Sequence, residues 1–245
     1  NALPGAVAQG LIWGLMAIGV YITFRILDVA DLTVDGSLAT GGAVAVMLIR
    51  AGLNAWAALL CAFLAGMLAG FVTGLFHTKC GIPAILAGIL TQLSLYSINL
   101  RIAGKANLPI FSQETIFANE FLEKQVPEAL KPYTVALILL LIVAVCKVLL
   151  DLYLKTRSGY LLRAVGDNDV LVTSLAKDKG MVKIIGLAIA NGFAALAGSV
   201  YCQQKGFFDI SIGTGTIVIG LANVIIGTQL FKRFGFVKST TAVII

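Results

Sequence analysis

The chain has 245 residues, of which 59% are hydrophobic and only 12% are charged, and its formal net charge is +6 at pH 7. Soluble domains carry about 25% charged residues, so this composition excludes a soluble globular protein and indicates an integral membrane protein. Windows of about 20 residues with almost no charge recur along the chain, and this is the length that a helix needs to cross the hydrocarbon core of a bilayer.

Seven apolar stretches of the chain predict membrane-spanning helices. In chain order they cover residues 3–24, 36–49, 55–76, 84–102, 133–154, 184–201 and 216–231. An eighth apolar run, residues 239–245, is cut off after a few residues, so we expect the natural protein to continue. The sequence therefore predicts an all-α polytopic membrane protein, with residues 1–245 forming one transmembrane domain: a bundle of about seven transmembrane helices and a truncated eighth.

Small residues recur at helical spacing in two of these stretches. Such stripes let two helices approach closely in a membrane. They predict packing inside one chain, with a dimer seam or a moving interface as the alternative. The stripes are Ala62, Gly66, Gly70 and Gly74 in the third stretch, and Gly186, Ala190, Ala194 and Gly198 in the sixth.

Polar side chains also occur inside the stretches, where they usually face a cavity or another helix rather than lipid. They either hydrogen-bond between helices or line a route for a solute, and the sequence leaves both alternatives open. Asp35 has a further alternative, because an Asp before Gly-Ser can cap the N-terminus of the following helix. The candidates for the route are Asp35, Thr91, Gln92, Ser94, Asn99, Asn191 and Asn223.

The sequence predicts no metal site. The four cysteines, Cys61, Cys80, Cys146 and Cys202, are far apart and form no Cys-x-x-Cys pair, so we interpret them as buried small residues. His77 is the only histidine and has no second ligand nearby in sequence, so we expect a solvated loop residue.

The orientation follows from the loops, because short cytoplasmic loops retain Lys and Arg. Residues 155–183 hold six basic side chains against three Asp, and residues 231–238 hold three with no acid. Both are predicted to be cytoplasmic. Residues 104–132 have no positive excess and form the predicted extracytoplasmic loop. Parity then places the N-terminus outside and the acidic residues 28–35 inside.

A polar island, residues 156–169, interrupts the apolar pattern after the fifth stretch. Ser158 is a candidate N-cap for a short helix, and Gly166 is suited to end that helix in a left-handed conformation. A second short helix is predicted over residues 169–179, with Gly180 as its stop. The pair is predicted to lie at the cytoplasmic membrane surface.

Two uses of this helix pair are open. Arg157 and Arg163 could meet lipid phosphates at the membrane surface. Alternatively, the exposed side chains form a docking surface for another protein.

The island also resembles a known family. The pattern from Thr156 to Asn168, Thr-x-x-Gly-x-x-Leu-Arg-Ala-Val-Gly-Asp-Asn, is similar to the cytoplasmic coupling loop of ABC importer permeases of the branched-chain amino acid and ribose type. The rest of the chain resembles a subgroup described as tryptophan or tyrosine transport permeases. Further segments that carry this resemblance are Leu32-Thr-Val-Asp-Gly-Ser37, Gly81-Ile-Pro-Ala-Ile-Leu-Ala-Gly-Ile-Leu90, Tyr96-Ser-Ile-Asn-Leu-Arg101 and Thr216-Ile-Val-Ile-Gly-Leu-Ala222.

The resemblance implies a set of partners in a bacterial inner membrane. They are a second permease subunit, expected to be another copy of this chain, a dimer of cytoplasmic ABC ATPases, an extracytoplasmic substrate-binding protein and membrane lipid, without nucleic acid. The chain has no Gly-x-x-x-x-Gly-Lys-[Ser/Thr] motif, so ATP-Mg is expected on the separate ATPase. This chain is therefore expected to be a transport subunit with no cofactor and no catalytic residue of its own.

The resemblance also assigns roles within the island. Gly159, Leu161, Leu162 and Arg163 are expected to contact the ATPase, while Gly166, Asp167 and Asn168 fix the turn between the two short helices.

The expected solute is an aromatic or branched-chain amino acid, with a sugar or nucleoside as the alternative. A secondary transporter or channel fits less well, because such proteins place ionisable groups deep inside spans. Apart from residues 28–35, the ionisable groups here lie near span ends.

Overall fold

The computed structural model describes residues 3–119, 131–167, 178–230 and 239–244. Two antiparallel strands, β1 (Asn107–Pro109) and β2 (Phe207–Asp209), pair with Leu108 opposite Phe208. The remaining elements are helices. They are α1 (Leu3–Val20), the π-helix η1 (Tyr21–Ile26), α2 (Thr33–Arg50), α3 (Ala55–Thr78), α4 (Ala84–Ala103), α6 (Lys131–Leu154), α7 (Arg157–Asp167), α9 (Lys179–Lys205), the 3-10 helix η3 (Ile210–Gly213), α10 (Thr216–Leu230) and α11 (Ser239–Ile244).

Six helical stretches in the described residues are long and apolar enough to cross a membrane. They confirm the prediction of an all-α polytopic membrane protein. The six are Leu3–Ile26, Ala55–Thr78, Ala84–Ala103, Tyr133–Leu154, Lys179–Lys205 and Ile210–Leu230. The predicted short span at residues 36–49 lies in α2, which is not among them and begins with polar residues.

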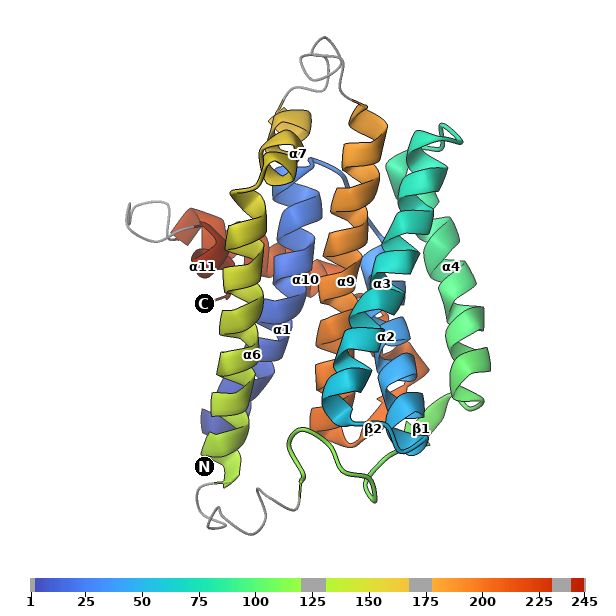
Figure 1. Cartoon of the computed structure of the whole chain (residues 1–245), viewed down its shortest axis with the longest axis vertical. Coiled ribbons are helices and arrows are strands. Elements are labelled where there is room, and N and C mark those ends of the chain that lie inside the picture. Colours follow the sequence, from blue (N-terminus) through green and yellow to red (C-terminus); the bar gives the residue numbers. More distant parts are fainter. Residues whose placement is uncertain (1–2, 120–130, 168–177, 231–238, 245) are drawn as a thin grey trace.

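Helix α9 forms the axis of the bundle, with α1, α2 and α3 packed against it (Figure 1). On α3, Gly66 and Gly70 lie so close to α9 that an added methyl group would collide with the backbone oxygens of Asn191 and Leu187 respectively. Helices in a bilayer gain little from burying apolar surface against each other and associate largely through such close packing. The prediction that the small-residue stripes pack within one chain is confirmed.

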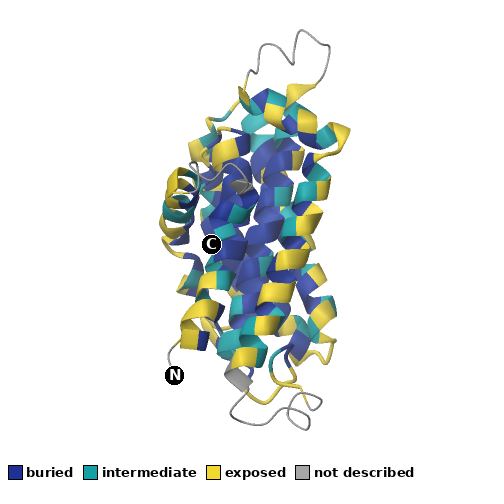
Figure 2. Cartoon of the chain, turned by 90° about the vertical axis from the view of Figure 1, so that its left-hand side faces the viewer, coloured by how far each residue is buried: buried dark blue, intermediate teal, exposed yellow. Residues whose placement is uncertain are grey.

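Helix α2 is enclosed by its neighbours, since 14 of its 18 residues are buried. Its Gly41 approaches the backbone of Ala195 on α9, and Gly198 of α9 approaches the Leu38 oxygen, so neither glycine has room for a side chain. Figure 2 shows the same division for the whole chain, with buried residues concentrated along the middle of the bundle and exposed ones along its outside.

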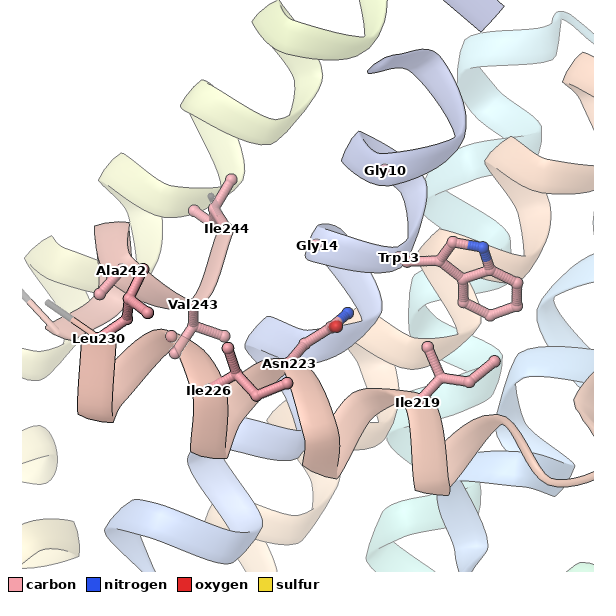
Figure 3. A pocket seen from close by; sticks show the side chains of 11 residues that line it. Gly10, Trp13, Gly14, Ile219, Asn223, Ile226, Leu230, Ala242, Val243 and Ile244 are labelled. Carbon is pink, nitrogen blue, oxygen red and sulfur yellow. The ribbon is translucent and has the colours of Figure 1, made fainter. Parts of the chain in front are cut away.

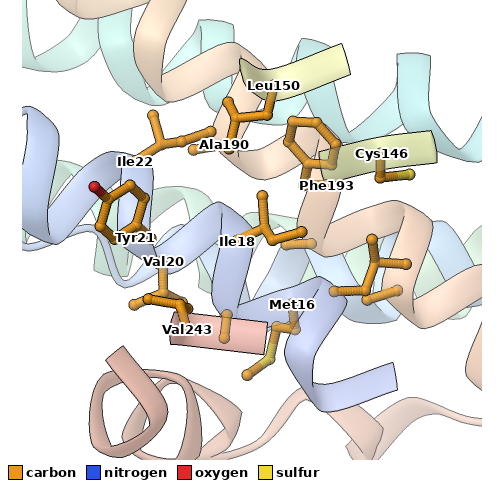
Figure 4. Close-up of a cluster of buried hydrophobic side chains, with 14 of the residues drawn as sticks. Met16, Ile18, Val20, Tyr21, Ile22, Cys146, Leu150, Ala190, Phe193 and Val243 are labelled. Carbon is orange, nitrogen blue, oxygen red and sulfur yellow. The ribbon is translucent and has the colours of Figure 1, made fainter. Parts of the chain in front are cut away.

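An apolar cluster joins α1 and η1 to α6, α9 and α11 (Figure 4). Ile18 and Ile22 meet Leu150 and Phe193 there, and each of these side chains is at most 7% exposed. Phe193 also packs edge-on against Phe63 of α3, with ring centroids 5.6 Å apart. Such a pair adds a geometric preference to simple burial. The cluster therefore ties the N-terminal helix to the axis of the bundle.

The two ends of the bundle differ. Helix α7 lies at one end with the turn between α3 and α4, whereas β1, β2 and the chain after α4 lie at the opposite end (Figure 1). Helix α10 runs across the bundle rather than along it, and its Gly220 packs on Met16 and Val20 of α1. Which end faces the cytoplasm stays a prediction from the distribution of basic residues.

Three predictions about local structure are wrong. Gly180 ends no helix but lies in the first turn of α9, where the Asp178 carboxylate accepts from the backbone N–H of Gly180 at 2.9 Å. His77 lies in the last turn of α3, half-buried, and its Nδ1 lies 2.9 Å from the Ile82 oxygen. Cys80 is exposed. For Gly180 and His77 the hydrogen-bond partner lies within a few residues, at a helix end.

The close approach of α2 to α9 can be tested with a single methyl group. Gly41→Ala would push a methyl into the backbone of Ala195, so we expect destabilisation of about 1–3 kcal/mol, the usual cost of overpacking. Gly5→Ala is the matched control, because Gly5 is a helical glycine with open space around it. Thermal unfolding of the detergent-solubilised protein measures both. Equal melting temperatures for the two variants would contradict the packing.

Candidate functional site

The helical run is interrupted between η1 and α2. Residues 27–32 are not helical, and Asp28 has a positive φ of 53°. Asp31 caps the new helix, since its Oδ1 accepts from the Thr33 N–H at 2.9 Å. Its Oδ2 accepts from Asn191 Nδ2 at 2.6 Å, and Asn191 lies near the middle of α9. Helix α2 therefore begins beside the middle of α9, and the Asp31 carboxylate is buried inside the bundle.

Hydrogen bonds extend from this point to two neighbouring helices. Ser37 of α2 donates to Asn191 Oδ1 at 2.6 Å, and the hydroxyls of Thr33 and Thr73 lie 2.8 Å apart between α2 and α3. All four side chains are at most 1% exposed. Buried polar groups cost free energy unless they are paired, so this network fixes α2 and α3 on α9. Asn191, a predicted route residue, makes interhelical hydrogen bonds here.

Asp35 caps a helix, but not the one expected from its sequence. Asp31 caps α2, while the Asp35 carboxylate accepts from the N–H of Gly215 at 2.9 Å, the hydroxyl of Thr216 at 2.8 Å and the N–H of Ile217 at 2.7 Å. These are groups at the start of α10. Asp35 is thereby a fixed link between α2 and the crossing helix α10.

A cavity of about 90 Å³ adjoins Asp35 between α2, α4 and η3. Gln92, Tyr96 and Asn99 line it from α4, and their i, i+4, i+7 spacing puts them on one helix face. Asn99 is fully buried, and its Nδ2 donates to the Gly36 oxygen at 3.4 Å. Its Oδ1 has no hydrogen-bond partner among the described residues. The structure therefore brings together three of the predicted route residues, namely Asp35, Gln92 and Asn99.

The other predicted route residues lie elsewhere. Thr91 and Ser94 donate to backbone oxygens one turn earlier in α4, at 3.0 and 2.9 Å, and line neither of the cavities described here. Asn223 lines a separate cavity of about 360 Å³ between α1, α10 and α11, and its side chain points toward α1 near Gly14 (Figure 3).

Both ends of α7 differ from those predicted for the first short helix of the island. It begins at Arg157, and the hydroxyl of Thr156 rather than Ser158 accepts from a first-turn N–H, that of Gly159 at 3.3 Å. Gly166 does not end the helix, which continues to Asp167. An added methyl group at Gly166 would collide with the Ile26 oxygen, so this glycine permits a close approach to η1. Asn168 and the predicted second helix at residues 169–179 lie mainly outside the described residues.

The predicted contact residues of α7 divide between its two faces. Leu162 is fully buried, and an added methyl group at Gly186 of α9 would lie 2.6 Å from both Leu162 and Leu27. Gly159 is also buried, and Leu161 is half-buried. On the exposed side of α7 lie Tyr160, which is 61% exposed, Arg163 and Asp167, and Arg157 at the start of the helix is exposed as well. These side chains are open to another protein, whereas the first set holds α7 on the bundle.

Two residues of the site escaped the sequence reasoning. Tyr160 lies three residues before Arg163. Residues three or four apart share one face of a helix, so helical spacing alone could have placed these two side chains together. Asp31 precedes Thr33 by two residues, which is the local pattern in which an Asp side chain accepts from the backbone two residues on. Within the described residues, no three His, Cys, Asp or Glu side chains converge as a metal site requires.

The sequence is similar to those of transport permeases. The family model described as branched-chain amino acid transport system / permease component matches residues 3–244. A tyrosine transport system permease protein of Clostridioides difficile is 46% identical over 245 residues, which cover 100% of this chain and 79% of that protein. An uncharacterized protein of Rickettsia prowazekii is 36% identical over 94% of this chain and 78% of that protein.

A more distant relative is an autoinducer 2 import system permease protein of Escherichia coli. It is 30% identical over 90% of this chain and 61% of its own length. No solved structure matches the chain.

The cap that Asp35 provides is open to a direct test. Asp35→Ala leaves two N–H groups at the start of α10 without their acceptor, so we expect a loss of about 1–3 kcal/mol in unfolding free energy. Asp35→Asn keeps one acceptor oxygen, so its unfolding free energy should lie between those of the wild type and Asp35→Ala. Asp28→Asn is the control, because Asp28 is exposed and Asn tolerates its positive φ. Wild-type stability of Asp35→Ala in a thermal melt would contradict the cap.

Proposed function

The chain belongs to the family of branched-chain amino acid transport permeases, and from this premise we propose that it carries tyrosine or a similar aromatic amino acid through the bacterial inner membrane, driven by a separate ABC ATPase. The observation that carries the proposal is the 46% identity to a tyrosine transport system permease along the whole of this chain. The missing phosphate-binding motif agrees with a motor on another polypeptide.

The ATPase is proposed to act on the exposed face of α7. Tyr160, Arg163 and Asp167 form this face, and its two opposite charges give it directional contacts. The buried face of α7 rests on Ile26 through Gly166 and packs beside Leu27 through Leu162. Force applied to α7 therefore reaches the end of η1 directly.

From η1 the same force has a short path to the cavity. Leu27 begins the non-helical segment that contains Asp31, and Asp31 is bonded to Asn191 of α9 and to the start of α2. Asp35, one turn further along α2, holds the start of α10. An importer needs two conformations with different access to its site. Displacement of residues 27–32 would shift α2 and α10 together, and so change access to the cavity beside them.

The substrate-binding protein is proposed to dock at the end opposite α7. Phe111 is 76% exposed there, Lys105 and Glu114 lie in the same part of the chain after α4, and Asp209 lies in β2, opposite Asn107 of β1. Hydrogen bonds from the side chain and backbone of Ser211 lower the pKa of Asp209, so its carboxylate is charged at neutral pH. A second copy of this chain is proposed to complete the route.

Reconstitution tests the solute and the energy source together. The full-length permease, its ATPase and its binding protein are placed in proteoliposomes, and uptake of labelled tyrosine is measured with ATP, without ATP and without the ATPase. We expect uptake only in the complete system. Uptake of a sugar or nucleoside in place of tyrosine would contradict the proposed solute, and uptake driven by an ion gradient without ATP would contradict the importer.

Charge reversal on α7 tests the ATPase contact. Arg163→Glu is expected to reduce ATP-driven uptake at least tenfold, while the variant keeps its level in the membrane, because Arg163 is exposed. Lys155→Glu is the matched control, a reversal of an exposed basic residue just before α7. Wild-type uptake by Arg163→Glu would remove this face from the contact.

A further inference from the structure

Asn99, one of the residues that line the cavity between α2, α4 and η3, has an unused hydrogen-bond acceptor. Asn99 Oδ1 is buried and has no partner among the described residues, although its Nδ2 is bonded to Gly36. Buried polar atoms in native structures are almost always paired, and an orphan commonly marks a missing water or ligand. An oxygen atom requires a donor, so the missing group must carry N–H or O–H.

The charged and polar groups around the cavity further restrict which chemical group could bind there. Asp35 lines the same space, and its three hydrogen-bond donors, Gly215, Thr216 and Ile217, are all neutral. Asp35 forms no ion pair with any described residue. The residues that line the cavity include one carboxyl group, that of Asp35, and no basic side chain, so the cavity favours a cationic group over an anionic one.

The cavity is large enough for a charged head group. Its volume is about 90 Å³, and a single water molecule needs only about 10–15 Å³ of such space. Tyr96 lines its wall and is 53% exposed, so an aromatic ring attached to a bound head group has an aromatic surface beside it.

We propose that this cavity binds the protonated amino group of the transported amino acid. Asn99 Oδ1 accepts one N–H of the ammonium group, and Asp35 supplies the opposing charge while still holding the start of α10. The ring of the solute lies outward, toward Tyr96. This assignment rests on the proposed function, because it names the part of that solute which the permease itself recognises.

The assignment predicts different binding for three small ligands that differ in charge and in hydrogen-bond donors. Tyramine has the ammonium group without a carboxylate, 3-(4-hydroxyphenyl)propionate has the carboxylate without an amine, and sodium chloride supplies a cation without N–H. The full permease–ATPase complex, without binding protein, is titrated with each ligand while its melting temperature is recorded. A ligand that binds only the folded protein raises the melting temperature by mass action. Tyramine is expected to raise it, and the other two are not.

Two variants separate the acceptor from general packing. Asn99→Leu has a similar volume without an acceptor, and we expect the tyramine concentration at half-maximal shift to rise at least tenfold, the usual loss for a hydrogen bond to a charged group. Asn99→Asp keeps an acceptor there and is expected to need no more tyramine than the wild type, which provides a second readout should the Leu variant fold poorly. Ser94→Ala is the control on α4, since its hydroxyl bonds only its own helix.

Several results would overturn the assignment. They are no shift with tyramine, an equal shift with the propionate or with sodium, and an unchanged tyramine response in Asn99→Leu. Failure of the proposed function is distinguishable, because it would appear as absent tyrosine uptake by the wild-type complex in proteoliposomes, whether or not tyramine binds.

Discussion

The contact of α9 with α2 and α3 at backbone distance is the constraint on which the rest of the structure depends. Lipid gives two helices little reason to associate through apolar burial alone, so the bundle needs surfaces that fit closely. Gly66 and Gly70 of α3 and Gly41 of α2 provide those surfaces by leaving out the side chain where the α9 backbone passes. Each also shortens the distance that a hydrogen bond between helices must cover.

That short distance allows buried polar side chains of neighbouring helices to form hydrogen bonds with each other. Asn191 reaches both Asp31 and Ser37 because α2 lies directly against α9, and without those bonds a buried carboxylate would be too costly to keep. The interrupted segment between η1 and α2 is thereby held against the middle of α9. The cavity at Asp35 and Asn99 exists beside this interruption.

The sequence predicted the features that follow from hydrophobicity and helical spacing, and missed those that depend on which particular group a side chain meets. Lengths of apolar windows gave the helical class, and helical spacing of Gly and Ala gave the packing within one chain. Asp35 looked like a cap for the next helix, yet its partner Gly215 is 180 residues away. Gly166 looked like a helix end because glycine favours that position, whereas its role is to admit the backbone of Ile26. Local pattern cannot distinguish these two uses of a glycine.

The central claim is that force on α7 moves the segment between η1 and α2. The most direct test is a pulsed electron paramagnetic resonance distance between spin labels at Asp28 and at Leu64, both exposed, in a chain without its four native cysteines. In the complex with the ATPase, the account predicts that ATP changes this distance and that Arg163→Glu abolishes the change. An ATP-driven transport cycle during which the distance stays constant would contradict it.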